Sequence, residues 1–206
     1  MNALSRILAQ QIIAIIRGAE PGDVLQIADA LKQGGVNILE VTLNSVNALS
    51  VIGELVDKYG DEMLIGAGTV LDSETAKTVI ELGAKFIVSP NVDVQTIEAT
   101  KTNGAVSIPG AFTATEIVNA YSSGGDIIKI FPASSAEYIK VLRGPLAHVP
   151  MMPTGGITLE NISEFKKAGA AAFGIGTSLV DTKKKITKDY LEQVTENAIK
   201  FIQAIS

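Results

Sequence analysis

The stretch VLQIADALKQGGVNILEVTL, residues Val24–Leu43, contains the unit from which the whole fold is predicted. Val24–Gln33 has a helical pattern, and Gly34-Gly35 follows it, because glycine readily adopts the left-handed backbone that commonly ends a helix. Ile38–Leu43 is then a short apolar run of strand length. A helix, a glycine and an apolar strand in this order predict a parallel α/β fold.

The same unit recurs along the chain at intervals of roughly 25 residues, near the lower limit for a (β/α)8 barrel. The expected strands are Ile12–Arg17, Ile38–Leu43, Met63–Gly68, Lys85–Pro90, Ala105–Gly110, Asp126–Phe131, Val149–Thr154 and Ala172–Thr177. Further helices are expected at Glu74–Leu82, Val94–Lys101 and Leu159–Ala168, with Asn2–Ala9 closing the bottom of the barrel and Thr187–Ile205 completing its outer ring. No Gly-x-Gly-x-x-Gly follows the first strand, which disfavours the alternative, an open doubly wound sheet. No Pro- or Ser-rich linker interrupts the pattern, so we expect one α/β domain, a (β/α)8 TIM barrel over residues 1–206.

The composition is that of an ordinary globular protein, since 47% of its 206 residues are hydrophobic and 19% are charged. The net charge is −5 and the largest basic cluster is Lys183–Lys185, so no nucleic-acid partner is expected. With no cysteine and a single histidine, His148, the sequence offers no histidine-rich zinc site, and we expect neither a metal nor another cofactor. We find no long apolar segment and no signal peptide, which predicts a cytoplasmic protein with no membrane partner.

Two charged residues lie inside apolar strands, where an unpaired charge is costly. Lys129 lies within Asp126-Ile-Ile-Lys-Ile-Phe-Pro132, and Glu40 lies within Ile38–Leu43. One interpretation is a structural ion pair between them. The other is an amine nucleophile with a pKa lowered by burial, beside a carboxylate that transfers protons. Because Schiff-base chemistry needs both groups, we predict Lys129 as the nucleophile and Glu40 as the general acid and base.

Two glycine-bearing turns follow the seventh and eighth expected strands, where barrels of this kind commonly bind phosphate. They are Thr154-Gly-Gly-Ile157 and Gly174-Ile-Gly-Thr-Ser178. Glycines let backbone N–H groups approach the phosphate oxygens, a short helix adds its N-terminal dipole, and the Ser178 hydroxyl adds a donor. Ordinary turn chemistry is the alternative, but two such turns at these places favour a phosphate site at Gly155, Gly156 and Ser178.

Other residues at the C-terminal strand ends suit recognition of a small acid. Arg17 ends the first strand, and its guanidinium can bind a carboxylate with two hydrogen bonds. Gly66-Ala-Gly-Thr-Val70 ends the third strand. Either its glycines leave room for a ligand, with the Thr69 hydroxyl able to bind a carboxylate, or they only permit tight strand–helix packing. His148 precedes the seventh strand at the opposite end, so it is interpreted as structural.

Over essentially its whole length the chain resembles the 2-keto-3-deoxy-6-phosphogluconate aldolases, a family of class I enzymes that includes 4-hydroxy-2-oxoglutarate aldolases and phosphogalactonate-specific relatives. The motifs that carry the resemblance are Leu39-Glu-Val-Thr-Leu43, Gly66-Ala-Gly-Thr-Val-Leu71, Phe86-Ile-Val-Ser-Pro90, Ile108-Pro-Gly110, Lys129-Ile-Phe-Pro-Ala133 and Pro153-Thr-Gly-Gly-Ile157. The resemblance implies that Lys129 forms the Schiff base and that Glu40 is the acid/base. It also implies that Thr69 and Pro90 line the pyruvate pocket, that Phe131 packs beside the imine, and that the protein is a homotrimer.

The sequence departs from the phosphogluconate branch at one position. Many of those enzymes carry an arginine after the second strand, where this chain has Asn44, and the phosphogalactonate branch resembles this chain in having Asn there and an arginine like Arg17. We therefore expect Arg17 to bind the pyruvate carboxylate, and the preferred configuration at C4 stays open.

The predicted reaction is cleavage of 2-keto-3-deoxy-6-phosphogluconate to pyruvate and glyceraldehyde 3-phosphate, with 4-hydroxy-2-oxoglutarate as a further substrate. The alternatives are the phosphogalactonate epimer as substrate, a phosphosugar isomerase or epimerase on the same barrel, or a silent barrel that binds a phosphorylated metabolite. The isomerase does not require a lysine in the sixth strand, and the silent barrel does not require Glu40 and Lys129.

Overall fold

Helices alternate with parallel strands in the computed structural model, which describes residues 1–60 and 62–206. The strands are β1 (Ile12–Ile16), β2 (Ile38–Thr42), β3 (Leu64–Gly68), β4 (Phe86–Val88), β5 (Val106–Ile108), β6 (Gly110–Ala111), β7 (Ile128–Ile130), β8 (Met151–Pro153) and β9 (Phe173–Ile175). The helices are α1 (Ala3–Gln10), α2 (Pro21–Gln33), α3 (Ala48–Tyr59), α4 (Ser73–Glu81), α5 (Val94–Thr102), α6 (Ala114–Ser122), α7 (Ala136–Arg143), α8 (Ile162–Lys167) and α9 (Lys188–Ile205).

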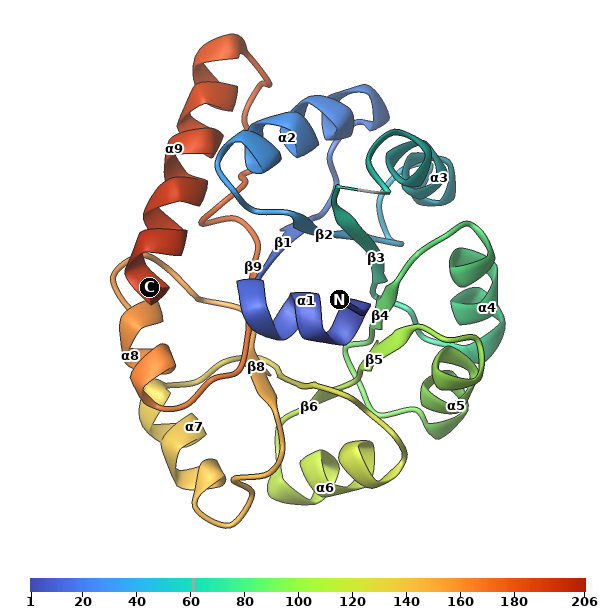
Figure 1. Ribbon diagram of the computed structural model, residues 1–206, viewed down its shortest axis with the longest axis vertical. Coiled ribbons are helices and arrows are strands. Elements are labelled where there is room, and N and C mark those ends of the chain that lie inside the picture. The colour runs from blue at the N-terminus through green and yellow to red at the C-terminus, as the bar shows by residue number, and fades with distance from the viewer. Residues whose placement is uncertain (61) are drawn as a thin grey trace.

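The strands stand in a ring with α2 to α9 around its outside, as Figure 1 shows. One sheet has the order β5-β4-β3-β2-β1-β9 and the other β6-β7-β8, and their ladders are parallel. β5 and β6 are two halves of one strand interrupted at Pro109, which has no N–H for the ladder. A bridge between Thr154 and Gly174 joins β8 to β9. The predicted α/β TIM-barrel fold is therefore confirmed, although the hydrogen-bonded sheet is not continuous around the ring.

The helix, glycine and strand at residues 24–43 fold as expected. In α2 the buried residues Val24, Ile27 and Leu31 recur at helical spacing, so one face of the helix packs against the strands. The helix ends at Gly34, and Gly35 follows with a positive φ of 85°, a conformation that glycine adopts without a Cβ penalty. The chain can then turn back into β2, whose residues are all buried.

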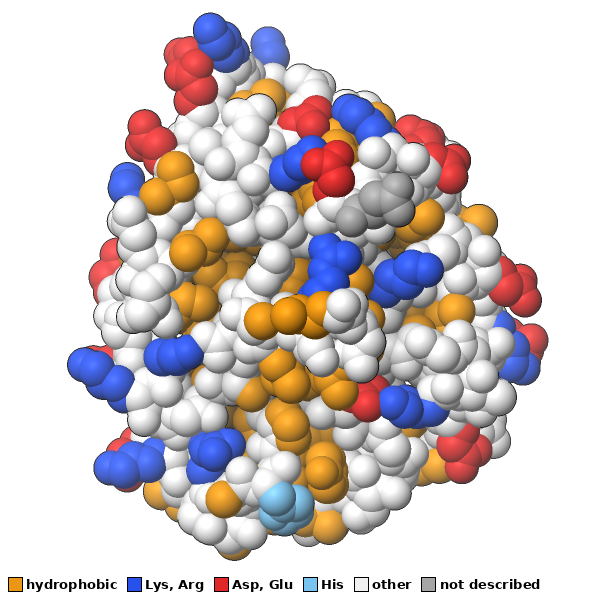
Figure 2. Space-filling model, viewed as in Figure 1, with side chains coloured by type: hydrophobic (Ala, Val, Ile, Leu, Met, Phe, Trp, Pro, Cys, Tyr) orange, Lys and Arg blue, Asp and Glu red, His pale blue; other side chains and the backbone are white. Residues whose placement is uncertain are grey.

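Helix α1 covers the N-terminal ends of the strands, as the prediction that this segment closes the bottom requires (Figure 1). Its Ile7 is fully buried in a cluster inside the ring that includes Ile13, Ile38 and Phe86. Figure 2 shows this face in the same view, with apolar side chains around α1 and most acidic side chains at the outer rim. The C-terminal strand ends therefore lie on the opposite face. Among the described residues, no helix combines the length and the apolar character needed to span a bilayer.

Candidate active site

The inward-facing side chains of β2 and β7 bring Glu40 and Lys129 into the barrel. Side chains alternate along a strand, so Leu39 and Val41 face the helices while Glu40 faces the interior. On the other side of the ring, Ile128 and Ile130 face outward and Lys129 faces inward. The apolar cluster inside the ring includes early strand residues such as Ile13, Ile38 and Leu64, which precede Glu40 in register, and it also reaches Val88 and Ile108 at the ends of β4 and β5.

The Glu40 carboxylate is completely buried, with 0% of the residue exposed. Neither of its oxygens accepts a hydrogen bond from a described residue. A Cβ at Gly68, on the neighbouring strand, would overlap this carboxylate. A Cβ at Gly66 would lie 2.5 Å from the Phe86 ring. Both glycines therefore make room for side chains inside the barrel, Phe86 and Glu40, which is not the strand–helix packing that was the alternative to a ligand site.

Lys129 is 3% exposed, and no ion pair among the described residues includes it. Its Nζ lies 4.9 Å from the centre of the Phe131 ring, close enough for a cation–π contact. Phe131 therefore lies near the Lys129 amine, as predicted. A direct structural ion pair with Glu40, the alternative interpretation, is absent from the described residues.

The pKa values of these two groups are moved in opposite directions. Burial lowers the pKa of Lys129 below its ordinary value; the Glu40 carboxylate opposes this change, and the Arg17 guanidinium adds to it. Burial raises the pKa of Glu40, while the positive charges of Lys129 and Arg17 oppose the rise. Both groups are thus displaced toward their neutral forms, which suits an amine nucleophile beside a carboxyl that exchanges protons.

A cavity of about 380 Å³ joins Arg17 to the predicted phosphate site. It is lined by Arg17, Phe131, Gly155, Gly156 and Ser178, among others. Four threonines, Thr154, Thr158, Thr177 and Thr182, also line it. The C-terminal ends of β1, β7, β8 and β9 meet here, so residues far apart in the sequence line one pocket, in which polar groups stand among apolar side chains.

The glycine turn after β8 has the backbone that the phosphate prediction needs. Gly155 and Gly156 have positive φ values of 85° and 77°. After β9, the N–H groups of Leu179 and Val180 both donate to Gly176 O, which forms a single helical turn. The Ser178 hydroxyl donates to Ile157 O at 2.5 Å and so links the two turns. Helix α8 begins at Ile162, later than the Leu159 expected from the sequence.

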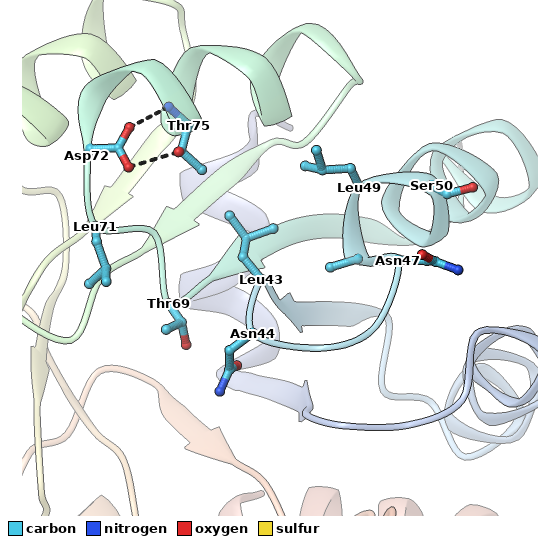
Figure 3. A pocket seen from close by; sticks show the side chains of 10 residues that line it. Leu43, Asn44, Asn47, Leu49, Ser50, Thr69, Leu71, Asp72 and Thr75 are labelled. Atoms are coloured by element: carbon cyan, nitrogen blue, oxygen red, sulfur yellow. Dashed lines mark hydrogen bonds between the residues drawn. The ribbon is translucent and has the colours of Figure 1, made fainter.

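Thr69 and Asn44 lie on the other side of the mouth (Figure 3). They line a second cavity, of about 710 Å³, between the ends of β2 and β3 and the starts of α3 and α4. In Figure 3 both side chains point away from those helices. Pro90 follows β4 at the same edge of the barrel, half-buried, and lines neither cavity. Thr69 and Pro90 are thus at the mouth but apart from the Arg17 pocket.

Hydroxyl residues around Arg17 were missed by the sequence analysis. The Ser45 Oγ accepts a hydrogen bond from the Gly18 N–H at 2.8 Å, and the Thr182 Oγ donates one to Arg17 O at 2.6 Å. Both residues lie in loops just beyond the ends of β2 and β9, so scanning past the strand ends for small hydroxyl side chains would have found them. His148 lies before β8, away from this face, with its ring centre 5.5 Å from that of Tyr121.

Comparison with known proteins places this geometry in a family. The family described as "Aldolase: KDPG and KHG aldolase" matches residues 4–197. The chain belongs to this family. Membership makes it a class I aldolase, a carbon–carbon lyase, and confirms the resemblance predicted from the sequence.

Individual members of the family are similar over most of the chain. The 2-dehydro-3-deoxy-6-phosphogalactonate aldolase of Escherichia coli is 35% identical over 94% of this chain and 93% of its own length. The 2-dehydro-3-deoxy-phosphogluconate aldolase of Pseudomonas aeruginosa is 33% identical over 75% of this chain and 71% of its own. The solved structure of KDPG aldolase from Legionella pneumophila, with pyruvate captured as a covalent carbinolamine, has a TM-score of 0.85 at 29% identity, with 97% of each chain covered.

Proposed function

We propose that this aldolase cleaves 2-keto-3-deoxy-6-phosphogluconate to pyruvate and glyceraldehyde 3-phosphate through a Schiff base on Lys129. The observation that carries the proposal is a buried amine and a buried carboxyl, without a direct ion pair between them among the described residues. The amine lies 4.9 Å from the centre of the Phe131 ring, which lines the pocket of about 380 Å³. A carbinolamine with pyruvate in the Legionella structure supports the same chemistry for a relative.

The first half of the reaction forms the imine. The neutral Lys129 Nζ attacks the C2 carbonyl carbon, and Glu40 supplies the proton with which the C2 hydroxyl of the carbinolamine leaves as water. The resulting protonated imine withdraws electrons from C3. Arg17 binds the C1 carboxylate, and the turns at Gly155, Gly156 and Ser178 bind the phosphate at the other end of the substrate.

The second half breaks the carbon–carbon bond. The Glu40 carboxylate accepts the proton of the C4 hydroxyl as the C3–C4 bond breaks, and the bonding electron pair moves into the enamine. Glyceraldehyde 3-phosphate leaves as the aldehyde. Glu40 then returns its proton to C3, and water hydrolyses the imine to release pyruvate and the free amine of Lys129.

A specific observation favours a second substrate, the C4 epimer 2-keto-3-deoxy-6-phosphogalactonate. Coverage does not separate the two branches, because the E. coli phosphogalactonate aldolase matches 94% of this chain and the Treponema pallidum phosphogluconate aldolase matches 99%. The observation that favours the galactonate epimer is the combination of Asn44 and Arg17. Comparing kcat/KM for the two epimers on the same preparation decides between them, and 4-hydroxy-2-oxoglutarate belongs in the same assay.

The decisive experiment is reduction with sodium borohydride in the presence of pyruvate, followed by peptide mass spectrometry. We expect one adduct, on Lys129, and loss of both the adduct and turnover in Lys129→Ala. Lys85→Ala is the matched control, because Lys85 is exposed and directly precedes β4 at the opposite end of the barrel. Folded wild-type protein that forms no adduct would leave the isomerase or the silent barrel as the better account.

Three further features are proposals of the same kind. We expect a homotrimer, as the family resemblance suggests, and light scattering after size-exclusion chromatography measures the subunit number. One domain over residues 1–206 and a cytoplasmic location, with no nucleic-acid or membrane partner, also remain predictions.

A further inference from the structure

We propose that Ser45 and Thr182 are positioning residues that hold the backbone around Arg17, and thereby set the affinity of the site for the substrate carboxylate. The inference rests on the proposed role of Arg17 in binding that carboxylate. It concerns two residues that make their contacts with the main chain on either side of Arg17 and act only through it.

The first set of contacts comes from the segment after β2. The Gly18 N–H donates to Ser45 Oγ at 2.8 Å, and Ser45 Oγ lies 3.1 Å from Thr42 Oγ1. Thr42 Oγ1 in turn donates to Ile16 O at 3.4 Å. Since the Thr42 hydroxyl proton is used on Ile16, the Ser45 hydroxyl donates to Thr42. The four groups then form one directed chain, in which each hydrogen bond polarises the next.

The second contact comes from the segment after β9, on the other side of Arg17. The Thr182 hydroxyl donates to Arg17 O at 2.6 Å. With the hydrogen bonds made by Ser45 and Thr42, the carbonyl groups of Ile16 and Arg17 and the N–H of Gly18 are all hydrogen-bonded to side chains. Both peptide groups that flank the Arg17 Cα are therefore held by side chains, from Thr42 at the end of β2 and from the segments after β2 and β9.

The Arg17 side chain itself is exposed and lines the cavity of about 380 Å³. No hydrogen bond or ion pair among the described residues uses its guanidinium. Gly18, with a φ of 69°, has no atom within 4 Å of the place where a Cβ would stand, so this residue adds no side-chain packing to the turn, whose flanking residues Ile16 and Ala19 are buried in the core. The hydroxyl contacts add to that packing in restraining the backbone at Arg17 and Gly18, while the guanidinium is available to a ligand.

Restraint of this kind has a measurable consequence. A guanidinium on a fixed backbone binds a carboxylate with less loss of conformational freedom than one on a mobile loop. Weakening the restraint should therefore reduce affinity for the carboxylate without altering the chemistry at Lys129. A purely structural role would lower the stability of the fold and leave the affinity unchanged.

The test uses the concentration of pyruvate that gives half-maximal borohydride trapping. In Ser45→Ala and in Thr182→Ala we expect this concentration to rise about three- to tenfold, the effect of one hydrogen bond, with the maximal trapping rate unchanged. Ser45→Thr and Thr182→Ser each keep a hydroxyl group, so their half-maximal pyruvate concentrations should equal that of the wild type. Thr78→Ala is the control, since the exposed Thr78 hydroxyl donates only to the Glu74 carbonyl within its own helix α4, at 3.0 Å.

Combination with Arg17→Ala separates a positioning role from a general one. We expect Ser45→Ala to add nothing to the loss of pyruvate affinity in the Arg17→Ala background, because there is no guanidinium left to position. An equal further loss in that background, or unchanged half-saturation in both alanine variants, would overturn the proposal. Wild-type protein that forms no adduct would instead contradict the proposed function, so the two failures are distinguishable.

Discussion

Lys129 and Glu40 owe their chemistry to the environment of each residue. An exposed lysine is almost entirely protonated at neutral pH and is a poor nucleophile. Inside the barrel, burial is the largest influence on both groups, and it lowers the pKa of Lys129 and raises that of Glu40. Their mutual attraction opposes both changes. The two pKa values are consequently brought closer together, which makes proton transfer near neutral pH less costly.

The charges around Lys129 predict how the pH profile of the amine responds to substitution. The Glu40 carboxylate raises the pKa of Lys129, and the Arg17 guanidinium lowers it. In the rate of borohydride trapping at saturating pyruvate, Glu40→Gln should therefore move the acid limb to lower pH. Arg17→Ala should move it to higher pH. Shifts in the same direction in both variants would show that these charges do not act on the amine.

At the scale of the element, β3 explains how a carboxylate fits inside a barrel of this size. β3 pairs with β2 so that Glu40 lies opposite Gly66 and Thr42 lies opposite Gly68. Any side chain at position 68 would occupy the space of the Glu40 carboxylate. The position of the general acid and base therefore depends on a neighbouring strand as well as on its own.

This dependence gives a second prediction. Gly68→Ala should displace the Glu40 carboxylate and lower kcat by about 100-fold, because a shift of about 1 Å can have that effect. Gly53→Ala, in α3, is the control, since a Cβ there has no atom within 4 Å. A Gly68→Ala enzyme with wild-type kcat and a pH profile like the wild type would mean that Glu40 tolerates the displacement or has no catalytic role.

The strands were predictable because each is apolar, short and followed by a glycine-ended helix. The charged residues in them were predictable for the same reason, since Lys129 and Glu40 stand out within apolar runs. Interruption of the fifth strand at Pro109 and the late start of α8 depend on hydrogen-bond geometry at the strand ends. The Ser45 and Thr182 contacts are between loops distant in the sequence, and no local pattern encodes which backbone group a hydroxyl will meet.

At the scale of the whole molecule, the stability of the fold and catalysis make conflicting demands on the barrel interior. Helix α1 and the cluster around Ile7 and Phe86 keep the lower interior apolar, which stabilises the fold. The upper interior holds Lys129 and Glu40, whose desolvation opposes folding. Catalysis thus lowers the stability of the native state, as is usual where an active site is buried in a core.

The last prediction follows from this conflict. Replacing both groups by apolar side chains of similar size, in Lys129→Met with Glu40→Met, should abolish turnover and raise the free energy of unfolding by about 1 to 4 kcal/mol. Each kcal/mol corresponds to a rise of roughly 2 to 4 °C in Tm for a chain of this length. Both residues are changed together because the charge of each opposes the pKa shift of the other, so a single substitution would also change the protonation of the group that remains. Lys85→Met with Glu98→Met is the control, since both of those side chains are exposed.

The gain in the free energy of unfolding of the double variant should depend on pH. A carboxyl whose pKa is raised by folding stabilises the native state below its ordinary value of 4.5, and this contribution is lost as pH rises toward the folded-state pKa. A lysine whose pKa is lowered by folding opposes the native state at low pH, and that cost disappears as pH rises from the folded-state pKa toward 10.5. The stability difference measured by urea unfolding should therefore increase above pH 4.5, be largest in between, and decrease toward pH 10.5. A difference that is constant across this range would mean that lost packing, not charge burial, separates the variant from the wild type.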